Sequence, residues 1–244
     1  MRRYTWKPDL PDQRDHKFGV SAGVALPTKV DLRSTCSPVE DQGDLSSCTG
    51  QAIVGALEYL EFKAKQPLVN LSRLFVYYQE RVIENSVKVD SGATIRSGIK
   101  ACNTVGVCHE AIWPYTISKF KIKPTKQAYA DAANRKITEY MRINDLPSFR
   151  GALAIGFPVV FGFSVYESFE SDAVAKTGKV PMPKKTEKLL GGHAVLAVGY
   201  DDTKNWAICR NSWGLNWGIR GYFYMPYAYL TDRNLSDDFW AIRK

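Results

Sequence analysis

The sequence contains few histidines, no long apolar run and no internal repeat. No segment is long and apolar enough to span a membrane, and residues 1–26 lack the apolar core of a signal peptide. The formal net charge of +8 reflects lysines spread over loops, and no nucleic-acid-binding motif accompanies them. We therefore expect a soluble chain with a basic surface, and neither nucleic acid nor a membrane as a partner. The compartment does not follow from the sequence.

Cysteine is also scarce. Five cysteines are too few for a dense disulfide scaffold, and their odd number leaves at least one thiol outside any intramolecular pair. Cys102, Cys108 and His109 lie close together, but their spacing fits no common zinc pattern, so structural roles are favoured. No metal and no other cofactor is expected. Whether any of Cys36, Cys102, Cys108 and Cys209 form a disulfide stays open.

The rest of the composition is typical of a globular protein, with 45% hydrophobic and 12% aromatic residues among 244. Residues 1–26 combine prolines, glycines and mixed charges, which predicts an extended N-terminal arm, and residues 27–244 then form the folded body. Within this body, helical spacing of apolar residues dominates from about 36 to 136, whereas short apolar strands dominate from about 137 to 240. The sequence therefore predicts a mainly helical lobe followed by a β-rich lobe.

Local patterns place the individual elements. Pro67 ends the first helix, Ser72 begins the second, and Gly106 ends the third. A loop rich in lysine and proline is expected from Glu170 to Leu190. The predicted helices span residues 52–64, 72–82, 95–102 and 127–135, and the predicted strands span 158–165, 193–200, 205–212 and 221–225.

One cysteine occupies a position suited to chemistry. A polar turn over residues 41–47 delivers Cys48 to the start of the first predicted helix, where unpaired backbone N–H groups and the helix dipole favour a thiolate. A nucleophilic thiolate needs a base, and the base needs an orienting partner. His193 follows two glycines at the start of a buried strand, and Asn211 is the natural third member. The competing interpretation is that Cys48 is an inert buried thiol.

The last predicted hairpin offers a way to bring these side chains together. If residues 201–203 form a three-residue turn, Tyr200 lies opposite Lys204, and continued pairing places His193 directly opposite Asn211. A slip of one residue would separate the two side chains, so this expectation depends on the register.

Three motifs follow one another along the chain: Gln42-Gly43-x-x-x-Ser47-Cys48, Gly192-His193-Ala194-Val195 and Asn211-Ser212-Trp213-Gly214. Over about residues 26–224 the chain thereby resembles the papain-like cysteine peptidases, and its Leu-Pro-x-x-Val-Asp-Leu-Arg lead is similar to the bacterial branch of that family. The resemblance implies an α+β, papain-like two-lobed fold, with a mainly helical lobe, a β-barrel-like lobe and an active-site cleft between them. It also implies thiol-dependent endopeptidase activity on a peptide or protein substrate.

The resemblance gives a role to each matching residue. Cys48 would be the nucleophile, paired with the His193 imidazolium, and Asn211 would orient the imidazole. The Gln42 side-chain amide and the Cys48 backbone N–H would form the oxyanion hole, while Trp213 would shield the His–Asn contact from water. Small residues at the matching specificity positions imply a pocket for a hydrophobic side chain. The implied substrate-binding residues are Gly92, Ala93, Thr94, Gly162, Gly191, Gly192, Ala194 and Trp213.

The chain departs from the family pattern beside the nucleophile. Leu45 and Val89 occupy positions that usually hold a disulfide pair, so we expect an apolar contact between them to brace this turn. Ser46 and Thr49 also replace the usual glycine and tryptophan. These changes alter the fine geometry of the turn, and the mechanism remains that of the family.

Two other functions and two roles for the arm stay open. An acyltransferase or ligase would pass the acyl group from Cys48 to an amine instead of water. A catalytically inactive papain-like binding module would need none of the four catalytic candidates. Residues 1–26 either contact the cleft as an inhibitory, propeptide-like segment or wrap the back of the body as a belt.

Overall fold

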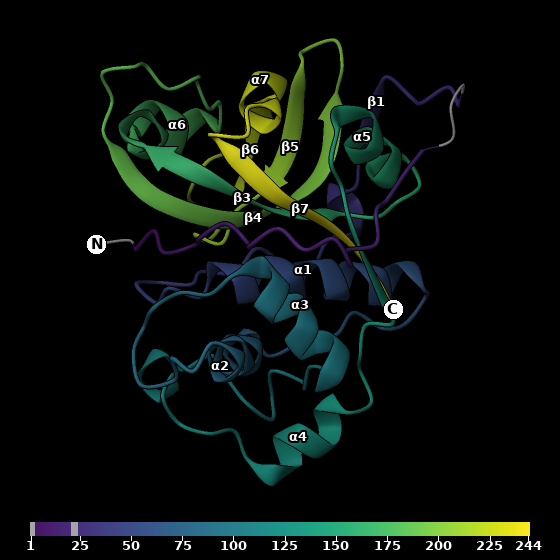
Figure 1. Cartoon of the computed structure of the whole chain (residues 1–244), viewed down its shortest axis with the longest axis vertical. Coiled ribbons are helices and arrows are strands. Elements are labelled where there is room, and N and C mark those ends of the chain that lie inside the picture. The colour runs from purple at the N-terminus through teal and green to yellow at the C-terminus, as the bar shows by residue number, and fades with distance from the viewer. Residues whose placement is uncertain (1–2, 21–23) are drawn as a thin grey trace.

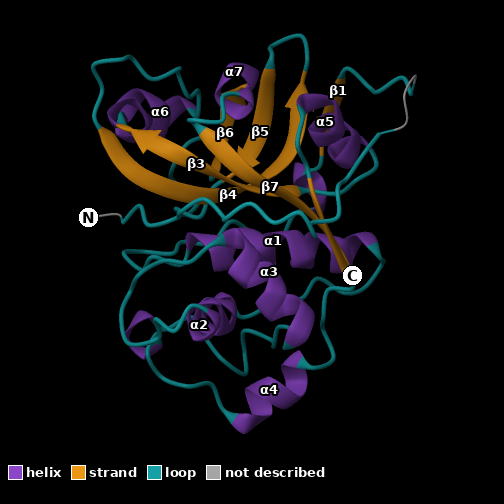
Figure 2. Ribbon diagram, viewed as in Figure 1, coloured by secondary structure: helices purple, strands orange, loops and turns teal. Residues whose placement is uncertain are grey.

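The computed structural model describes residues 3–20 and 24–244, and these form two lobes (Figure 1). One lobe is built around an antiparallel sheet and the other from helices (Figure 2). This arrangement is the predicted α+β, two-lobed fold. The helices of the second lobe are α1 (Cys48–Lys63), α2 (Arg73–Ile83), α3 (Ile95–Thr104) and α4 (Lys126–Ala132).

Capping residues set where these helices begin. Ser72, Thr94 and Thr125 each accept a hydrogen bond from the backbone N–H three residues further on, at 3.1–3.2 Å. The longest helix, α1, differs from its amphipathic prediction, because it is buried on all sides from Cys48 to Glu61. It lies between strand β4 (Leu189–Asp201) on one side and α2 and α3 on the other (Figure 1).

Seven strands of the described chain form one sheet, in the order β2-β7-β3-β4-β5-β6, with β1 paired to the end of β4. The sequence patterns predict neither β2 nor β7, since each carries as many polar as apolar residues. The predicted loop 170–190 also contains a short helix, α6. The remaining elements are β1 (Lys29–Asp31), β2 (Glu139–Arg142), β3 (Val159–Tyr166), β5 (Trp206–Arg210), β6 (Tyr222–Pro226), β7 (Ser236–Arg243), α5 (Leu146–Ala154), α6 (Asp172–Thr177) and α7 (Tyr227–Thr231), with short 3-10 turns at Arg33–Thr35, Ile117–Lys119 and Glu167–Glu170.

The hairpin between β4 and β5 has a different register from the predicted one. Asp201 pairs with Trp206, so the turn has four residues instead of three. The strand β5 then ends before Asn211. The predicted ladder pairing of His193 with Asn211 is therefore wrong, although their side chains meet beyond the end of the ladder.

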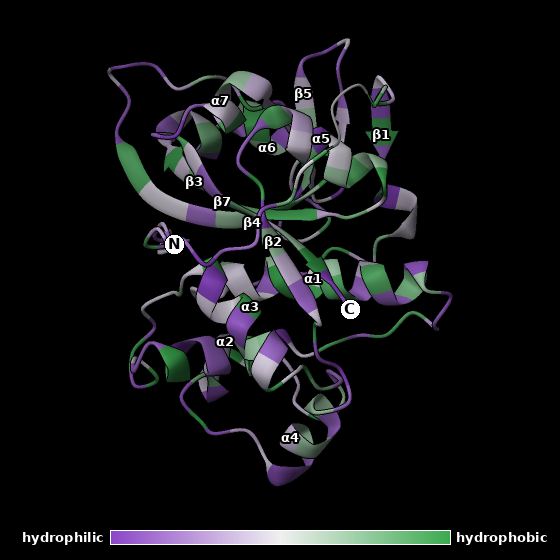
Figure 3. Ribbon diagram, turned by 45° about the vertical axis from the view of Figure 1, so that its right-hand side comes forward, coloured by the Kyte–Doolittle hydropathy of each residue, from purple (hydrophilic) through white to green (hydrophobic). Residues whose placement is uncertain are grey.

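The apolar core lies in three places: inside the sheet lobe, inside the helical lobe and between the two. The cluster between the lobes joins α1 to β3 and β4. Figure 3 shows hydrophobic segments of α1 and β4 in this region and hydrophilic segments along the outer loops. Among the described residues, no helix is both long enough and apolar enough to cross a membrane.

Residues 3–20, here called the arm, run in an extended path between the two lobes (Figures 1 and 2). Thr5 forms a parallel bridge with Gly192 of β4, and Lys17 forms another with Arg142 of β2. The predicted arm spans residues 1–26, of which 1–2 and 21–23 lie outside the described residues. The arm therefore contacts the inner surface of both lobes over most of its described length.

Candidate active site

Cys48 is the first residue of α1, as predicted, and it lies in the buried cluster between the lobes with 1% of its surface exposed. The turn before it is held to the sheet lobe, because the Gln42 backbone N–H donates to the Ser212 carbonyl at 2.9 Å. Gly43 has a φ of +62°, which glycine adopts without strain. The turn therefore fixes the thiol at the junction of the two lobes.

His193 and Asn211 meet beside this junction. Their side chains lie 2.9 Å apart between Nε2 and Oδ1, and both residues are buried. The Asn211 oxygen also accepts from the Ser212 N–H at 2.8 Å, so an oxygen faces the ring and Nε2 donates to it. Trp213 stacks on the imidazole at 5.0 Å with 25° between the ring planes. Asn211 and Trp213 thereby fix the imidazole in one orientation.

The Gln42 side chain is held at both of its polar atoms. Its Oε1 accepts from the Ser212 hydroxyl at 2.6 Å, and its Nε2 donates to the Leu45 carbonyl at 2.8 Å. The Tyr115 hydroxyl donates to the Gln42 backbone carbonyl at 2.9 Å and lies 2.6 Å from the Ser47 hydroxyl. An amide nitrogen carries two protons, so Nε2 has a second one for another acceptor.

The turn before the nucleophile is not braced as the sequence predicts. Leu45 is buried in the helical lobe, whereas Val89 is 55% exposed, so Val89 does not form the buried apolar brace that the sequence predicts. The brace is Asp90, which accepts from the Ser46 N–H at 3.1 Å and from the Ser46 hydroxyl at 3.0 Å. The Tyr77 hydroxyl donates to the same carboxylate at 2.5 Å. A hydrogen-bonded carboxylate therefore replaces the usual disulfide, and sequence reasoning missed it because Asp90 matches no catalytic motif.

The start of the arm lies directly on the predicted substrate-binding glycines. A Cβ built on Gly92 would lie 2.2 Å from Thr5 Oγ1, and one on Gly191 would lie 2.3 Å from the Tyr4 carbonyl oxygen. The Tyr4 ring packs edge-on against His193, with 6.1 Å between the centroids. The start of the arm therefore covers His193 and two of the predicted substrate-binding glycines.

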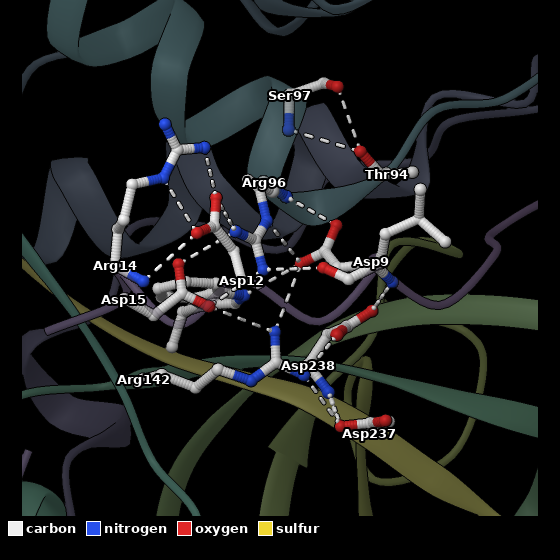
Figure 4. Close-up of polar contacts among 12 residues, drawn as sticks. Asp9, Asp12, Arg14, Asp15, Thr94, Arg96, Ser97, Arg142, Asp237 and Asp238 are labelled. Atoms are coloured by element: carbon white, nitrogen blue, oxygen red, sulfur yellow. Dashed lines mark hydrogen bonds and ion pairs between the residues drawn. The ribbon is translucent and has the colours of Figure 1, made fainter. Parts of the chain in front are cut away.

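Two arginines hold the middle of the arm from opposite lobes (Figure 4). Arg96, on α3, donates to both carboxylate oxygens of Asp15 at 2.8 Å, and its backbone N–H donates to Asp9 at 3.2 Å. Arg142, on β2, lies 3.6 Å from Asp9 and donates to Asp238 at 2.7 Å. The Asp9 backbone N–H in turn donates to Asp238 at 2.7 Å. These five residues, here called the clamp, join both lobes to the arm.

The two central carboxyl groups of the clamp are buried. Burial raises the pKa of Asp9, although hydrogen bonds and charges from Arg96 and Arg142 oppose this. Burial together with the charge of Asp9 raises the pKa of Asp238 to about 7. With the arm in place, Asp238 therefore keeps its proton up to about pH 7, whereas an exposed aspartate loses its proton near pH 4.

The protonation of Cys48 differs from the prediction. Burial raises the pKa of this thiol to about 12, and backbone N–H groups, including that of Ala194, offset the rise only in part. The expected thiolate is therefore absent from the covered arrangement. The N–H groups at the helix start lower the pKa of the thiol. Burial in one cluster with Trp6 removes water from the thiol and raises its pKa by more.

The other predicted substrate-binding residues have mixed surroundings. Ala93 and Ala194 are buried, whereas the Thr94 hydroxyl caps α3 and also donates to Glu84 at 3.1 Å. Trp213 lies against the imidazole. Gly162 and Gly192 lie under the indole of Trp6.

The other cysteines have structural surroundings. Cys102 and Cys108 are buried in different apolar clusters, and His109 forms an ion-pair geometry with Asp131, with 3.0 Å between Nδ1 and the carboxylate. None of the five cysteines in the described chain forms a disulfide. The neighbouring Cys and His residues are thus used separately in the fold.

Comparisons with known proteins identify the family to which the chain belongs. A family model described as papain family cysteine protease matches residues 26–235. The chain is 48% identical over 214 residues to an uncharacterised peptidase C1-like protein of Acanthamoeba polyphaga mimivirus, covering 84% of this chain and 69% of that protein. It is 30% identical over 239 residues to pro-cathepsin H of Bos taurus, covering 91% of this chain and 66% of the relative. The chain thus spans about two thirds of the length of these curated relatives.

Solved structures show the same likeness. The chain is 43% identical to xylellain, a cysteine protease from Xylella fastidiosa, with a TM-score of 0.93 and coverage of 100% of this chain and 98% of that one. Digestive procathepsin L2 proteinase of Tenebrio molitor, at 20% identity and a TM-score of 0.78, covers 100% of this chain and 78% of its own, and shows the shared fold.

Proposed function

Because the chain belongs to the papain family of cysteine proteases, we propose that it is a thiol-dependent endopeptidase whose acyl-enzyme forms on Cys48. The observation that carries the proposal is the buried histidine–asparagine pair, 2.9 Å apart, together with the backbone N–H of the next residue, Ala194, which reaches the thiol of the cysteine that starts α1. In the reaction, Cys48 Sγ attacks the carbonyl carbon of the scissile bond while His193 holds the thiol proton. His193 then protonates the leaving amine, and it later accepts a proton from the water that hydrolyses the thioester.

Asn211 and Gln42 have separate roles in this cycle. Nε2 of His193 is hydrogen bonded to Asn211, so Nδ1 is the ring nitrogen that exchanges a proton with Cys48. The oxygen of Asn211 also stabilises the imidazolium that forms. The second Nε2 proton of Gln42 and the Cys48 backbone N–H would donate to the oxyanion of the tetrahedral intermediate. Ser212 supports both roles, because it contacts Gln42 and Asn211 at once.

The arm is proposed to inhibit this activity. Thr5 and Tyr4 occupy the glycine-lined surface that a substrate backbone needs, and the clamp fastens the following residues to both lobes. The covered thiol is also neutral, since its pKa is raised to about 12. Activity therefore requires displacement of the arm, which readmits water and restores the conditions for a thiolate.

The test is hydrolysis of a fluorogenic dipeptide amide by the full-length chain under reducing conditions, with a thiol-trapping epoxide as a second readout. It is run on the unmodified chain and on Arg96→Met, which loosens the clamp. We expect turnover and labelling of Cys48 in both proteins, faster in the variant, and neither in Cys48→Ala. If neither protein shows turnover or labelling, the endopeptidase proposal is wrong.

The same assay separates the acyltransferase from the peptidase. Added amine nucleophiles compete with water for the thioester, so the ratio of aminolysis to hydrolysis reports which acceptor the site admits. We expect hydrolysis to dominate at millimolar amine. Aminolysis as the main product would favour the acyltransferase instead.

A further inference from the structure

We propose that the specificity pocket is shaped for a two-ring aromatic side chain and that Gly162 sets its size. This deepens the proposed peptidase function and rests on it. The structure already contains such an occupant, because Trp6 of the arm inserts its indole between the lobes and is only 6% exposed. Its backbone N–H donates to the Gly192 carbonyl at 3.0 Å, immediately before His193.

The floor under the indole is made of residues without side-chain bulk. A Cβ built on Gly162 would lie 1.9 Å from Cε2 and 2.2 Å from Cζ2 of Trp6, and one on Gly192 would lie 2.7 Å from Cε3. In the β3–β4 ladder Gly162 pairs with Ala194, and Gly192 lies two residues from Ala194 on the same face. The six-membered ring of the indole therefore rests directly on two glycines and is flanked by an alanine.

Gly162 is placed where glycine is otherwise unfavourable. It lies inside β3, at an irregularity in the pairing with β7, and its φ is not in the left-handed region. Glycine within a strand weakens the strand and commonly marks a close approach of another group. Because no turn or positive φ requires it here, the contact with the ring is the reason that the position suits glycine.

The pocket is apolar as well as wide. Trp6 shares a buried cluster with Val160, Ala194 and Cys48, so its occupant lies beside the nucleophile. The Trp6 Nε1–H is buried and finds no acceptor within the part of the chain that is described. An unpaired buried donor weakens binding, so a fused ring of the same size without the N–H should bind better than an indole.

The proposal is tested with the full-length chain and a set of fluorogenic dipeptide amides. They differ only at P2, the second residue on the N-terminal side of the scissile bond. The P2 residue is 2-naphthylalanine, tryptophan, phenylalanine, leucine or alanine. Ratios of kcat/KM do not depend on the fraction of molecules with a displaced arm. We expect naphthylalanine to exceed leucine about tenfold, from its larger apolar area, and to exceed tryptophan roughly fivefold or more.

Gly162→Val tests the residue itself. Its side chain would fill the floor, so the ratio of naphthylalanine to leucine should fall at least roughly tenfold, while cleavage of the leucine substrate persists. Gly19→Val is the matched control, because a Cβ at Gly19 meets nothing within 4 Å, and it should keep the ratio of the unmodified chain.

The assays test the pocket, the role of Gly162 and the peptidase function separately. Leucine cleaved as fast as naphthylalanine by the unmodified chain overturns the pocket proposal, even if the variant does not fold. An unchanged ratio in a folded Gly162→Val variant overturns the role of Gly162. Absence of cleavage of every substrate, together with absence of Cys48 labelling, overturns the peptidase function itself.

Discussion

Replacing Arg96 with methionine should release the arm from the helical lobe and activate the full-length chain. The Arg96 side chain is 11% exposed and makes two 2.8 Å hydrogen bonds to Asp15. Its guanidinium also lies 3.4 Å from Asp12 and 3.8 Å from Asp9. Methionine keeps the apolar stem of the side chain, so the change removes the charge and the donors with little loss of packing.

The expected size follows from these contacts. Hydrogen bonds to charged groups contribute about 1.5–3 kcal/mol. In the variant, the buried Asp9 carboxyl would also lose one of its two neighbouring arginines. We therefore expect a net weakening of arm closure by about 2–3 kcal/mol, because water at Asp12 and Asp15 recovers part of the gross loss. Since 1.4 kcal/mol is a factor of ten, the released fraction should rise roughly 30- to 150-fold while the covered state still dominates.

The assay compares the rate of Cys48 modification by a neutral epoxide with the rate of peptide hydrolysis. Both should rise by the same factor, because both require the released arm. Arg14→Met is the control: Arg14 is in the arm, its side chain is 86% exposed, and it pairs with Asp12 in the arm itself. Equal rates of Cys48 modification and hydrolysis in the Arg96 and Arg14 variants would refute the role of the clamp. A rise in these rates only at temperatures that unfold the chain would refute it as well.

Three further predictions concern single residues. Asp90→Ala should leave the Ser46 N–H and the Tyr77 hydroxyl without their acceptor, lowering the free energy of unfolding by about 2–3 kcal/mol and lowering kcat, as urea unfolding and steady-state kinetics would show. Leu45→Asp should destabilise the fold by about 3–5 kcal/mol, because the leucine is 2% exposed in an apolar cluster; unchanged unfolding would contradict this packing. The folded chain raises the pKa of Asp238 from 3.8 to about 7, so its contribution to stability is present below about pH 4 and lost as the pH rises to 7. Asp238→Asn should therefore reduce the stability lost between pH 4.5 and 7.5 by on the order of 2 kcal/mol, and an identical loss in both proteins would contradict it.

The site could be anticipated from the sequence where the chemistry depends on residue type and order. The start of α1 at Cys48 follows from a polar turn before an apolar run, and among the described residues His193 is the one histidine at the start of the buried part of β4. The contact of His193 with Asn211 was predicted through a wrong register. It forms because Asn211 lies beyond the end of β5, where the ladder no longer fixes the direction of the side chain.

Features that depend on long-range contacts could not be anticipated. Asp90 braces the nucleophile turn from 44 positions along the chain, and no local pattern distinguishes it from the exposed Val89 next to it. The pKa of Cys48 depends on burial in a cluster that includes Trp6, so the helix start alone gives the wrong direction. Periodicity describes one element at a time, whereas these properties arise where the arm and two lobes meet.

The arm belongs to the same chain as the site that it covers, and residues 21–28 connect it to β1 along the sequence. A tethered ligand acts at an effective concentration that dilution does not change, on the order of millimolar for a short link. Even a weakly held arm therefore competes with substrates at ordinary concentrations. One cut in residues 24–28 would turn the arm into a separate peptide, whose occupancy would then fall on dilution. A single peptide bond would thereby determine whether the arm stays tethered to the site that it covers.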